Sequence, residues 1–228
     1  MTNMIETSLS CTIWGMGQSA TTANHFRNLI NHFAELTADP NTAPICSGGN
    51  FTDWQGHDFS MRGMFSVEAA TISGMGHLLS FTGSDTIPST SALQYYYPEK
   101  NGQKILVGAS VPATEHSVMC AGSKENELET YRRLLKIYPK GILSVVSDTW
   151  DLWKVLTEIL PALKDEIMAR DGKLTVRPDS GDPANILCGD PFAPEGSPAY
   201  KGVIECLWDV FGGTRNTKNY KVLDPHIG

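Results

Sequence analysis

Several residues that could do chemistry stand just after short apolar runs of the sequence. In chain order they are Asp85, Ser110, His116, Asp148, Arg177, Pro178 and Asp179. A guanidinium group binds phosphate oxygens in a planar fork, whereas a carboxylate accepts hydrogen bonds from sugar hydroxyls. A ligand that carries both phosphate and hydroxyl groups, such as a phosphorylated ribose, would suit this combination.

Taken singly, these residues have plainer explanations. Asp85 and Asp148 could each be the N-cap of a helix, and His116 could be a hydrogen-bonded loop histidine. Independent caps would not be expected to bring an arginine, a histidine and three carboxylates to one face of the protein. Their joint occurrence therefore favours a shared pocket.

An aromatic residue and an arginine stand three positions apart earlier in the chain. Phe59 and Arg62 lie just ahead of a stretch of small residues from Ser66 to His77. A planar ring at the entrance of a phosphate site could stack on a heteroaromatic substrate while the arginine holds an anionic co-substrate. The alternative is that Phe59 belongs to the core and Arg62 is a surface charge.

Strands and helices must position these side chains. Apolar runs predict strands near residues 78–81, 105–107, 142–146 and 174–176. Apolar spacings of three and four predict helices over 21–38, 124–138 and 150–168, the last kinked or divided at Pro161. Residues 39–56 predict a loop, and the regular pattern decays after about residue 184.

The alternation of strands and helices indicates an α/β fold. Helices of this length between strands are typical of β-α units and a parallel sheet, either open or closed into a barrel. In such folds ligands bind at the carboxyl ends of the strands. The residues that follow the apolar runs are therefore the first candidates for a site.

The composition excludes several classes of protein. The 228 residues are 41% hydrophobic and 19% charged, and 18 Lys and Arg against 25 Asp and Glu give a net charge of −7. Such an acidic chain is not expected to bind nucleic acid or an anionic membrane through its overall charge. No apolar stretch is long enough to span a bilayer and the first residues do not resemble a signal peptide, so a cytoplasmic location is expected.

Other signatures are missing from the sequence. The five cysteines are widely spaced and form no Cys-x-x-Cys pair, so neither a disulfide framework nor a structural zinc site is expected. The glycine-rich loop of ATPases, the His-Glu-x-x-His of zinc proteases and the dinucleotide-binding fingerprint do not occur. We therefore expect no metal held by the protein alone.

Five blocks of sequence together resemble the nicotinamide phosphoribosyltransferase family. They are Asp58-Phe59-x-x-Arg62-Gly63, Phe81-x-Gly83-x-Asp85-Thr86, Ser110-Val111-Pro112-Ala113-x-Glu115-His116-Ser117, Ser144-Val145-Val146-Ser147-Asp148-x-x-Asp151 and Arg177-Pro178-Asp179-Ser180-Gly181-x-Pro183. The blocks occur in the family's order with family-like separations. The resemblance covers most of this chain and places it in the central part of a family member.

The resemblance implies a fold and an assembly. Residues 57–228 would form part of an incomplete type-II phosphoribosyltransferase barrel, which is TIM-like. Residues 1–56, with the amphipathic helix, would belong to a second, β-rich domain. The family assembles as a homodimer with its active sites at the interface, so a homodimer is expected here.

The resemblance also implies roles for the residues that bind the pyridine ring. Phe59 looks like the aromatic residue that stacks on one face of the ring, and Asp85 like the carboxylate that accepts from the carboxamide N–H. A carboxylate at that position would favour nicotinamide and repel nicotinate. Ser110 stands in a matching block and is expected to bind substrate.

The other roles concern the phosphoribosyl group. Arg62 and Arg177 resemble residues that bind the diphosphate and the ribose phosphate, and Pro178 belongs to the same block. Asp179 resembles a residue that contacts the ribose hydroxyls. Asp148 would lie among the same carboxylates, and His116 matches the histidine that the family phosphorylates from ATP. We group His116, Asp148 and Asp179 as the expected catalytic residues.

The implied reaction joins nicotinamide to 5-phosphoribosyl 1-diphosphate and yields nicotinamide mononucleotide and diphosphate. Mg²⁺ is expected with the diphosphate substrate, and ATP as an activating co-substrate. Two alternatives remain open, which are a nicotinate phosphoribosyltransferase and a non-catalytic fragment that only binds nucleotide.

The sequence also departs from the family's pattern. Met61 stands where the family often has a tyrosine, and Gly15-Met16-Gly17 replaces a segment with proline. The family's N-terminal region, which supplies an aromatic residue from the partner subunit, and its glycine-rich phosphate loop are expected outside this chain.

Overall fold

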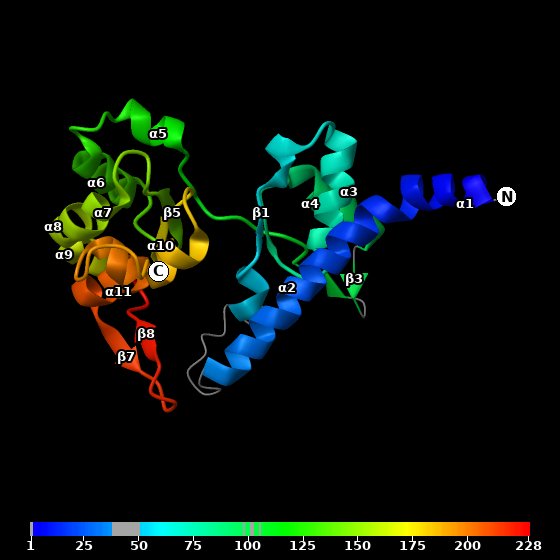
Figure 1. Ribbon diagram of the computed structural model, residues 1–228. Helices are drawn as coiled ribbons and strands as arrows, with labels where there is room; N and C mark the ends of the chain where they lie inside the picture. Colours follow the sequence, from blue (N-terminus) through cyan, green and yellow to red (C-terminus); the bar gives the residue numbers. More distant parts are fainter. Residues whose placement is uncertain (1, 38–50, 98, 101–102, 105) are drawn as a thin grey trace. The chain divides into compact units, whose positions relative to one another are not determined.

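The protein is described by a computed structural model that covers residues 2–37, 51–97, 99–100, 103–104 and 106–228 (Figure 1). The chain divides into two compact units, Met1–Ser110 and Val111–Gly228. This division does not coincide with the boundary expected between residues 56 and 57, and the assignment of either part to a family domain stays a prediction. Each unit is a mixture of helices and short strands.

The first unit begins with a long helical run. Its described elements are α1 Thr2–Leu9, the π-helix η1 Ser10–Trp14, α2 Gly15–Thr37, the 3-10 helix η2 Phe51–Trp54, β1 His57–Asp58, the 3-10 helix η3 Ser60–Gly63, α3 Val67–His77, β2 Gly83–Ser84, α4 Ile87–Tyr96, β3 Glu99–Lys100 and β4 Gln103–Lys104. The helix predicted over 21–38 is therefore confirmed as α2. Of the predicted loop, residues 39–50 lie outside the described residues.

Short parallel strands joined by helices organise the rest of the first unit. β1 pairs in parallel with β2, and Gly83 in β2 forms a parallel bridge with Ala109. The helix α3 connects the two strands, and α4 follows β2. A small core of Met75, Leu78, Leu93 and Val107 lies among these elements. These are β-α units, as the alternating sequence pattern predicts.

Most apolar side chains of α2 are exposed in the part of the chain that the structure describes. Phe26, Leu29, Phe33 and Leu36 are all exposed, and Ala23 is the buried residue of the helix. The spacing of apolar residues thus predicted the helix correctly. It could not show which neighbour, if any, each side chain meets.

Two helices of the first unit approach closely at a glycine. A Cβ at Gly76 in α3 would lie 2.6 Å from the backbone oxygen of Met16 and 2.8 Å from the backbone nitrogen of Ala20 in α2. Ser19 Oγ also donates to the backbone oxygen of Ser73 at 2.5 Å. Only a residue without a side chain allows this contact between backbones.

We therefore expect Gly76→Ala to destabilise the first unit. The added methyl group must push α2 away from α3, and the better helix propensity of alanine offsets only part of that cost, so the net loss is about 1–2 kcal/mol. Urea denaturation measures it. Gly63→Ala is the matched control, because a Cβ at Gly63 meets nothing within 4 Å. Equal stability of the two variants would show that the helices do not need this close approach.

The second unit contains more helices and two short sheets. Its described elements are α5 His116–Ala121, α6 Glu127–Ile137, β5 Leu143–Val146, α7 Leu152–Lys154, the π-helix η4 Val155–Ile159, α8 Leu160–Ala162, α9 Lys164–Met168, β6 Leu174–Arg177, α10 Pro183–Cys188, α11 Pro198–Phe211, β7 Gly213–Arg215 and β8 Lys221–Leu223. The helix expected over 124–138 is confirmed as α6. The strands expected at 142–146 and 174–176 are confirmed as β5 and β6.

Parallel pairing in the second unit follows chain order. β5 pairs in parallel with β6, Ala113 bridges to Ser144, and Leu174 bridges to Ile227. Helices join these segments, so the unit is again built from β-α units. β7 and β8 form a separate antiparallel pair. Leu143, Val145 and Leu174 are fully buried in one hydrophobic cluster with the helices α6 to α9 and α11.

The helical stretch predicted over 150–168 is present but divided. α7, η4 and α8 run into one another, a break follows at Leu163, and α9 begins at Lys164. Pro161 lies just before this break. Because proline has no N–H, the helix ladder cannot be continuous there, and the Leu160 N–H bonds to the Val155 oxygen in a π-turn.

Two predicted strands differ from the sequence analysis, and several helices, among them α3, α4 and α11, were not predicted. The strand expected at 78–81 is wrong, since the Leu78 N–H bonds back to the Gly74 oxygen and residues 78–80 form a turn after α3. Leu106 and Val107 also lie outside any strand. The helix α11 lies in the region after residue 184, where the sequence pattern predicts no helix. Its break at Gly202, which has φ of 81°, interrupts the helical spacing.

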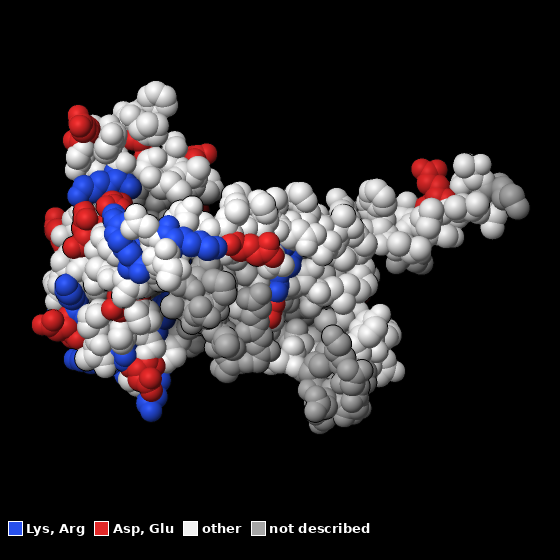
Figure 2. Space-filling view, turned by 90° about the horizontal axis from the view of Figure 1, so that it is seen from below, with Lys and Arg blue, Asp and Glu red and all other residues white. Residues whose placement is uncertain are grey.

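The charged residues are spread unevenly along the chain. Figure 2 shows Lys and Arg interspersed with Asp and Glu over the surface of the second unit, whereas the visible surface of α1 and α2 is mainly uncharged. The face in view carries no extended area of one sign. Within the described residues, no helix combines the length and apolar character needed to cross a membrane.

Candidate active-site residues

Three of the expected catalytic residues lie close together in the second unit. His116 Nε2 is 3.3 Å from Asp179 Oδ2 and 3.9 Å from Asp148 Oδ1. The other ring nitrogen, Nδ1, is 3.1 Å from Thr149 Oγ1. The imidazole thus has carboxylates at one nitrogen and a hydroxyl at the other, which is an arrangement that can hold or move a proton.

The ends of two neighbouring strands and the start of a helix position this cluster. Asp148 follows the end of β5, Asp179 follows the end of β6, and His116 is the first residue of α5. Because β5 and β6 pair in parallel, their carboxyl ends lie at the same edge. The sequence predicted this relation for the second unit.

Asp148 ties the two strand ends together. Its side chain is 6% exposed, and Oδ2 accepts from the Asp179 N–H at 2.9 Å and from Ser180 Oγ at 2.6 Å. Burial raises the pKa of this carboxyl, but the hydrogen bonds from Ser180 and Asp179 outweigh burial and leave the pKa below its ordinary value. Asp148 is therefore a carboxylate at neutral pH.

A buried hydroxyl pair supports the backbone just before Asp148. Tyr131 OH donates to Ser147 Oγ at 2.8 Å, and Ser147 Oγ donates to the Val145 oxygen at 2.9 Å. The Ser147 N–H continues the ladder to the Arg177 oxygen at 3.0 Å. Burial raises the pKa of Tyr131 far above its ordinary value, so its hydroxyl stays a donor.

Arg177 and Pro178 begin the loop that carries Asp179. Arg177 Nη2 donates to the Thr114 oxygen at 3.0 Å, and Thr114 Oγ1 accepts from the Val146 N–H at 3.0 Å. Arg177 therefore ties the segment before α5 to the ends of β5 and β6. Pro178 fixes φ at the first residue of the loop.

A second group of candidate residues lies in the first unit. Ser110 Oγ donates to Asp85 Oδ1, and His57 Nε2 lies 3.3 Å from the same oxygen. The rings of His57 and Phe59 have centroids 4.7 Å apart. The Asp85 side chain is 34% exposed and Phe59 is 40% exposed, so a ligand can reach both.

The plainer explanations can now be tested against the structure. The N-cap of α4 is Thr86 and that of α7 is Asp151, whose Oδ1 accepts from the Lys154 N–H at 3.1 Å. The N-cap explanation is therefore wrong for Asp85 and for Asp148. Phe59 is too exposed to be a core residue. Arg62 lies on the 3-10 helix η3 and is exposed, as a surface charge would be.

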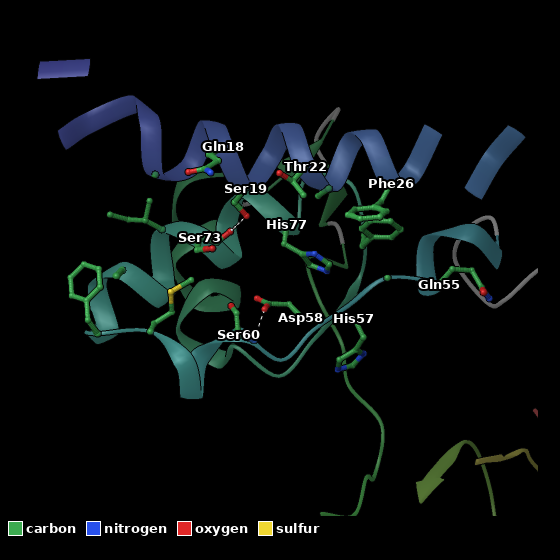
Figure 3. Close-up of a pocket in the computed structure, with 18 of the residues that line it drawn as sticks. Gln18, Ser19, Thr22, Phe26, Gln55, His57, Asp58, Ser60, Ser73 and His77 are labelled. Atoms are coloured by element: carbon green, nitrogen blue, oxygen red, sulfur yellow. Dashed lines mark hydrogen bonds between the residues drawn. The ribbon is translucent and has the colours of Figure 1, made fainter. Parts of the chain in front are cut away.

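A groove of about 860 Å³ in the first unit does not have Asp85 in its lining. It runs between α2 and the elements β1 and α3, and Figure 3 shows side chains from α2 facing Ser73 and His77 across it. Asp58 and His57 reach its lining from β1, but neither Asp85 nor Arg62 belongs to it. This groove is not the place where the sequence predicts the pyridine ring.

No group of three His, Cys, Asp or Glu side chains within the described ranges could hold a metal ion. A metal that arrives on a substrate phosphate needs only one or two protein carboxylates. Asp148 Oδ1 is buried without a hydrogen bond among the described residues. Together with the nearby Asp179, it offers the kind of oxygen ligand that such a metal takes.

Comparison with known proteins identifies the family. Residues 54–224 match the model of the nicotinate phosphoribosyltransferase (NAPRTase) family, and this match covers most of the chain and all of the candidate residues. The chain belongs to the NAPRTase family. The resemblance drawn from the five sequence blocks is confirmed.

Relatives of this NAPRTase-family chain carry a more specific name. Nicotinamide phosphoribosyltransferase from Acinetobacter baylyi is 46% identical over 235 residues, which is all of this chain and 44% of that protein. The enzymes of the same name from Mycoplasma pneumoniae and Xanthomonas campestris are 42% and 29% identical, with 46% and 41% of their lengths covered. The chain spans less than half the length of each relative.

Several residues of this candidate site were not predicted from the sequence. Thr149 contacts His116, and Ser180 donates to Asp148. Both stand next to a predicted aspartate in the sequence, which is the feature that could have identified them. His57 and Asp58 directly precede Phe59. Burial raises the pKa of Asp58, but hydrogen bonds led by Ser60 outweigh it, so the pKa lies below its usual value and a charged carboxylate braces the turn that carries Phe59.

Proposed function

We propose that this chain takes part in the transfer of the 5-phosphoribosyl group from 5-phosphoribosyl 1-diphosphate to nicotinamide, with nicotinamide mononucleotide and diphosphate as products. The observation that carries the proposal is the match of the whole chain, at 46% identity, to a relative named nicotinamide phosphoribosyltransferase. The arrangement of the candidate residues supports it.

The residues of the first unit suit recognition of the pyridine ring. Phe59 offers an exposed aromatic face for stacking. Asp85 offers a carboxylate to the carboxamide N–H, and Ser110 holds one of its oxygens. A carboxylate at this position attracts the amide of nicotinamide and repels the anion nicotinate. Arg62, which follows Phe59 by three residues in the sequence, supplies a positive charge for the diphosphate.

The residues of the second unit suit the ribose and its departing group. Diphosphate departure leaves positive character on the glycosidic carbon, so catalysis comes mainly from neutralising the leaving group and orienting the ring nitrogen. We assign phosphate binding to Arg177, at the end of β6, and ribose hydroxyl binding to Asp179, on the loop that Pro178 begins. Asp148 orients Asp179 through the hydrogen bond to its N–H.

Mg²⁺ enters this proposal with the diphosphate substrate. When bound, it would supply positive charge to the phosphate oxygens. Asp148 and Asp179 would hold such an ion, because Asp148 Oδ1 is buried without a hydrogen bond among the described residues and Asp179 lies beside the same imidazole.

ATP is proposed as an activating co-substrate that phosphorylates His116. The exposed ring of His116, held at Nδ1 by Thr149, suits a phosphoryl acceptor at Nε2. This assignment rests on the family resemblance.

The fold and assembly are proposed in the same way. The parallel, chain-ordered pairing in each unit supports part of a TIM-like, type-II phosphoribosyltransferase barrel. A homodimer is proposed from the resemblance, and sedimentation would test it. A cytoplasmic location is proposed because phosphorylated substrates do not cross a bilayer unaided.

Nicotinate phosphoribosyl transfer is the second candidate function. The family name favours it, since the matching model is named for nicotinate. Asp85 argues against it, because its carboxylate would face the carboxylate of nicotinate.

The decisive experiment is an assay of product formation by the purified 228-residue chain. Cooperative unfolding is confirmed first, and nicotinamide or nicotinate is then supplied with 5-phosphoribosyl 1-diphosphate and Mg²⁺. We expect nicotinamide mononucleotide from nicotinamide and little product from nicotinate. Preference for nicotinate would establish the second candidate. Binding of the mononucleotide by a folded sample without turnover would establish a chain that only binds.

A further inference from the structure

One histidine touches both residues assigned above to the pyridine ring. His57 Nε2 lies 3.3 Å from Asp85 Oδ1, and the His57 ring centroid is 4.7 Å from that of Phe59 at an interplanar angle of 37°. We propose that His57 is a positioning residue that holds the Asp85 carboxylate in place and thereby sets the preference for a carboxamide over a carboxylate. The inference rests on the proposed function.

The backbone fixes where this imidazole lies. His57 belongs to β1 and pairs with Gly83 of β2, and a Cβ at Gly83 would come within 2.6 Å of His57 Nδ1. The ring therefore lies against the neighbouring strand, where a side chain on residue 83 would displace it. The Asp85 N–H donates to the Asp58 oxygen at 2.9 Å, which fixes Asp85 relative to the same strand.

Two groups converge on one oxygen of Asp85. Ser110 Oγ donates to Oδ1, and His57 Nε2 faces the same atom. Among the described residues no hydrogen bond reaches Oδ2 of Asp85. One oxygen of the carboxylate is thus held, and the other can accept the amide N–H of a ligand. His57 Nε2 must carry a proton to donate to Oδ1.

His57 Nε2 is itself a buried nitrogen that lacks a well-aligned hydrogen bond among the described residues. Buried polar atoms nearly always have a hydrogen-bond partner, so one is expected for His57 Nε2. Asp85 Oδ1 lies within reach of it, at 3.3 Å. His77 does not share this task, because its Nε2 lies 3.0 Å from the Gly83 oxygen instead.

Two variants distinguish the role of the His57 Nε2 nitrogen from that of the aromatic ring. His57→Phe keeps an aromatic ring beside Phe59 and removes Nε2, whereas His57→Gln keeps a donor near the place of Nε2 and removes the ring. We expect His57→Phe to weaken nicotinamide binding about tenfold and to reduce the preference over nicotinate, because the nitrogen that faces the Asp85 carboxylate is removed. His57→Gln should stay near the wild type. His32→Phe, at an exposed position on α2, is the matched control.

The experiment measures binding of nicotinamide and of nicotinate to the folded 228-residue chain by ligand-observed NMR. The His57 tautomer is read in the same wild-type sample from long-range ¹H–¹⁵N couplings, and we expect the proton on Nε2. A proton on Nδ1, or a His57→Gln variant as weak as His57→Phe, would overturn the inference. An unchanged nicotinamide preference in His57→Phe would also overturn it. Failure of the wild type to bind nicotinamide would instead refute the proposed function, and the role of His57 with it.

Discussion

Asp148→Ala is expected to lower the rate of nicotinamide mononucleotide formation by about a hundredfold or more. The carboxylate is 6% exposed and accepts two hydrogen bonds from the loop that carries Asp179. Each hydrogen bond to a charged group is worth about 1.5–3 kcal/mol, and the two donors would lose their partner together. Asp179 would then no longer be held beside His116, and steady-state kinetics on the folded variant would measure the loss.

The control is an aspartate of the same unit without these contacts. Asp171 is 83% exposed, and its ion pair with Lys140 Nζ is long, at 3.9 Å. Such an exposed pair contributes little, so Asp171→Ala should leave both the rate and the stability nearly unchanged. Hydrogen exchange gives a second reading, since the Asp179 amide should lose protection in Asp148→Ala alone. A variant with full rate and an equally protected amide would show that the loop is positioned by other contacts.

The same carboxylate predicts a dependence of stability on pH. Its pKa in the folded protein lies below that in the unfolded chain, so the unfolded chain binds more protons as the pH falls. The stability that Asp148 contributes is therefore complete above the unfolded pKa of about 3.9 and is lost as the pH falls through the folded pKa. The difference in unfolding free energy between the wild type and Asp148→Asn should shrink over that acidic range.

The parts of the fold that could be predicted are those that bury a regular apolar face. On the helical stretch 150–168, Leu156, Leu160, Leu163 and Ile167 share the spacing that predicted a helix, and all are buried. β5 and β6 are buried runs with β-branched residues, for which the same logic holds.

The strands of the first unit could not be predicted in this way. β1 and β2 have two residues each, and Gly83-Ser84 carries no apolar signal. These strands exist because their backbones pair with neighbours such as Ala109, which is information that only the tertiary structure holds. Leu78 and Phe81 are buried as expected, but on the turn that follows α3, and an apolar run alone does not separate the two cases.

The candidate site, like the fold, could be predicted from the sequence only in part. The rule that ligands bind after parallel strands pointed to Asp148 and Asp179, and both meet His116. The same rule could not find His57, because its partner Asp85 comes from a segment that sequence spacing does not relate to β1. Contacts between side chains of different strands depend on register, and register is set by pairing rather than by local pattern.

Leu156→Ala is expected to cost the second unit about 2–5 kcal/mol of unfolding free energy, because truncation of a buried leucine loses apolar burial and leaves a cavity. Leu156 is fully buried in the cluster that also holds Leu143 of β5 and Leu174 of β6. It lies on the π-helix η4, just before Pro161, where the helix is already irregular. The strands β5 and β6, which share its cluster, carry candidate residues at their carboxyl ends. A loss of packing there should therefore loosen the loops of Asp148 and Asp179 as well as lower the stability.

Urea denaturation and near-UV circular dichroism of Leu156→Ala would measure both effects. Leu187→Ala is the matched control, since Leu187 on α10 is 37% exposed and belongs to no part of that cluster, and its cost should stay below about 1 kcal/mol. If both variants lost the same stability, the cluster beneath β5 and β6 would not be the core that holds the second unit together. A large loss confined to Leu156→Ala would tie the order of the candidate residues to the buried cluster that Leu156 shares with β5 and β6.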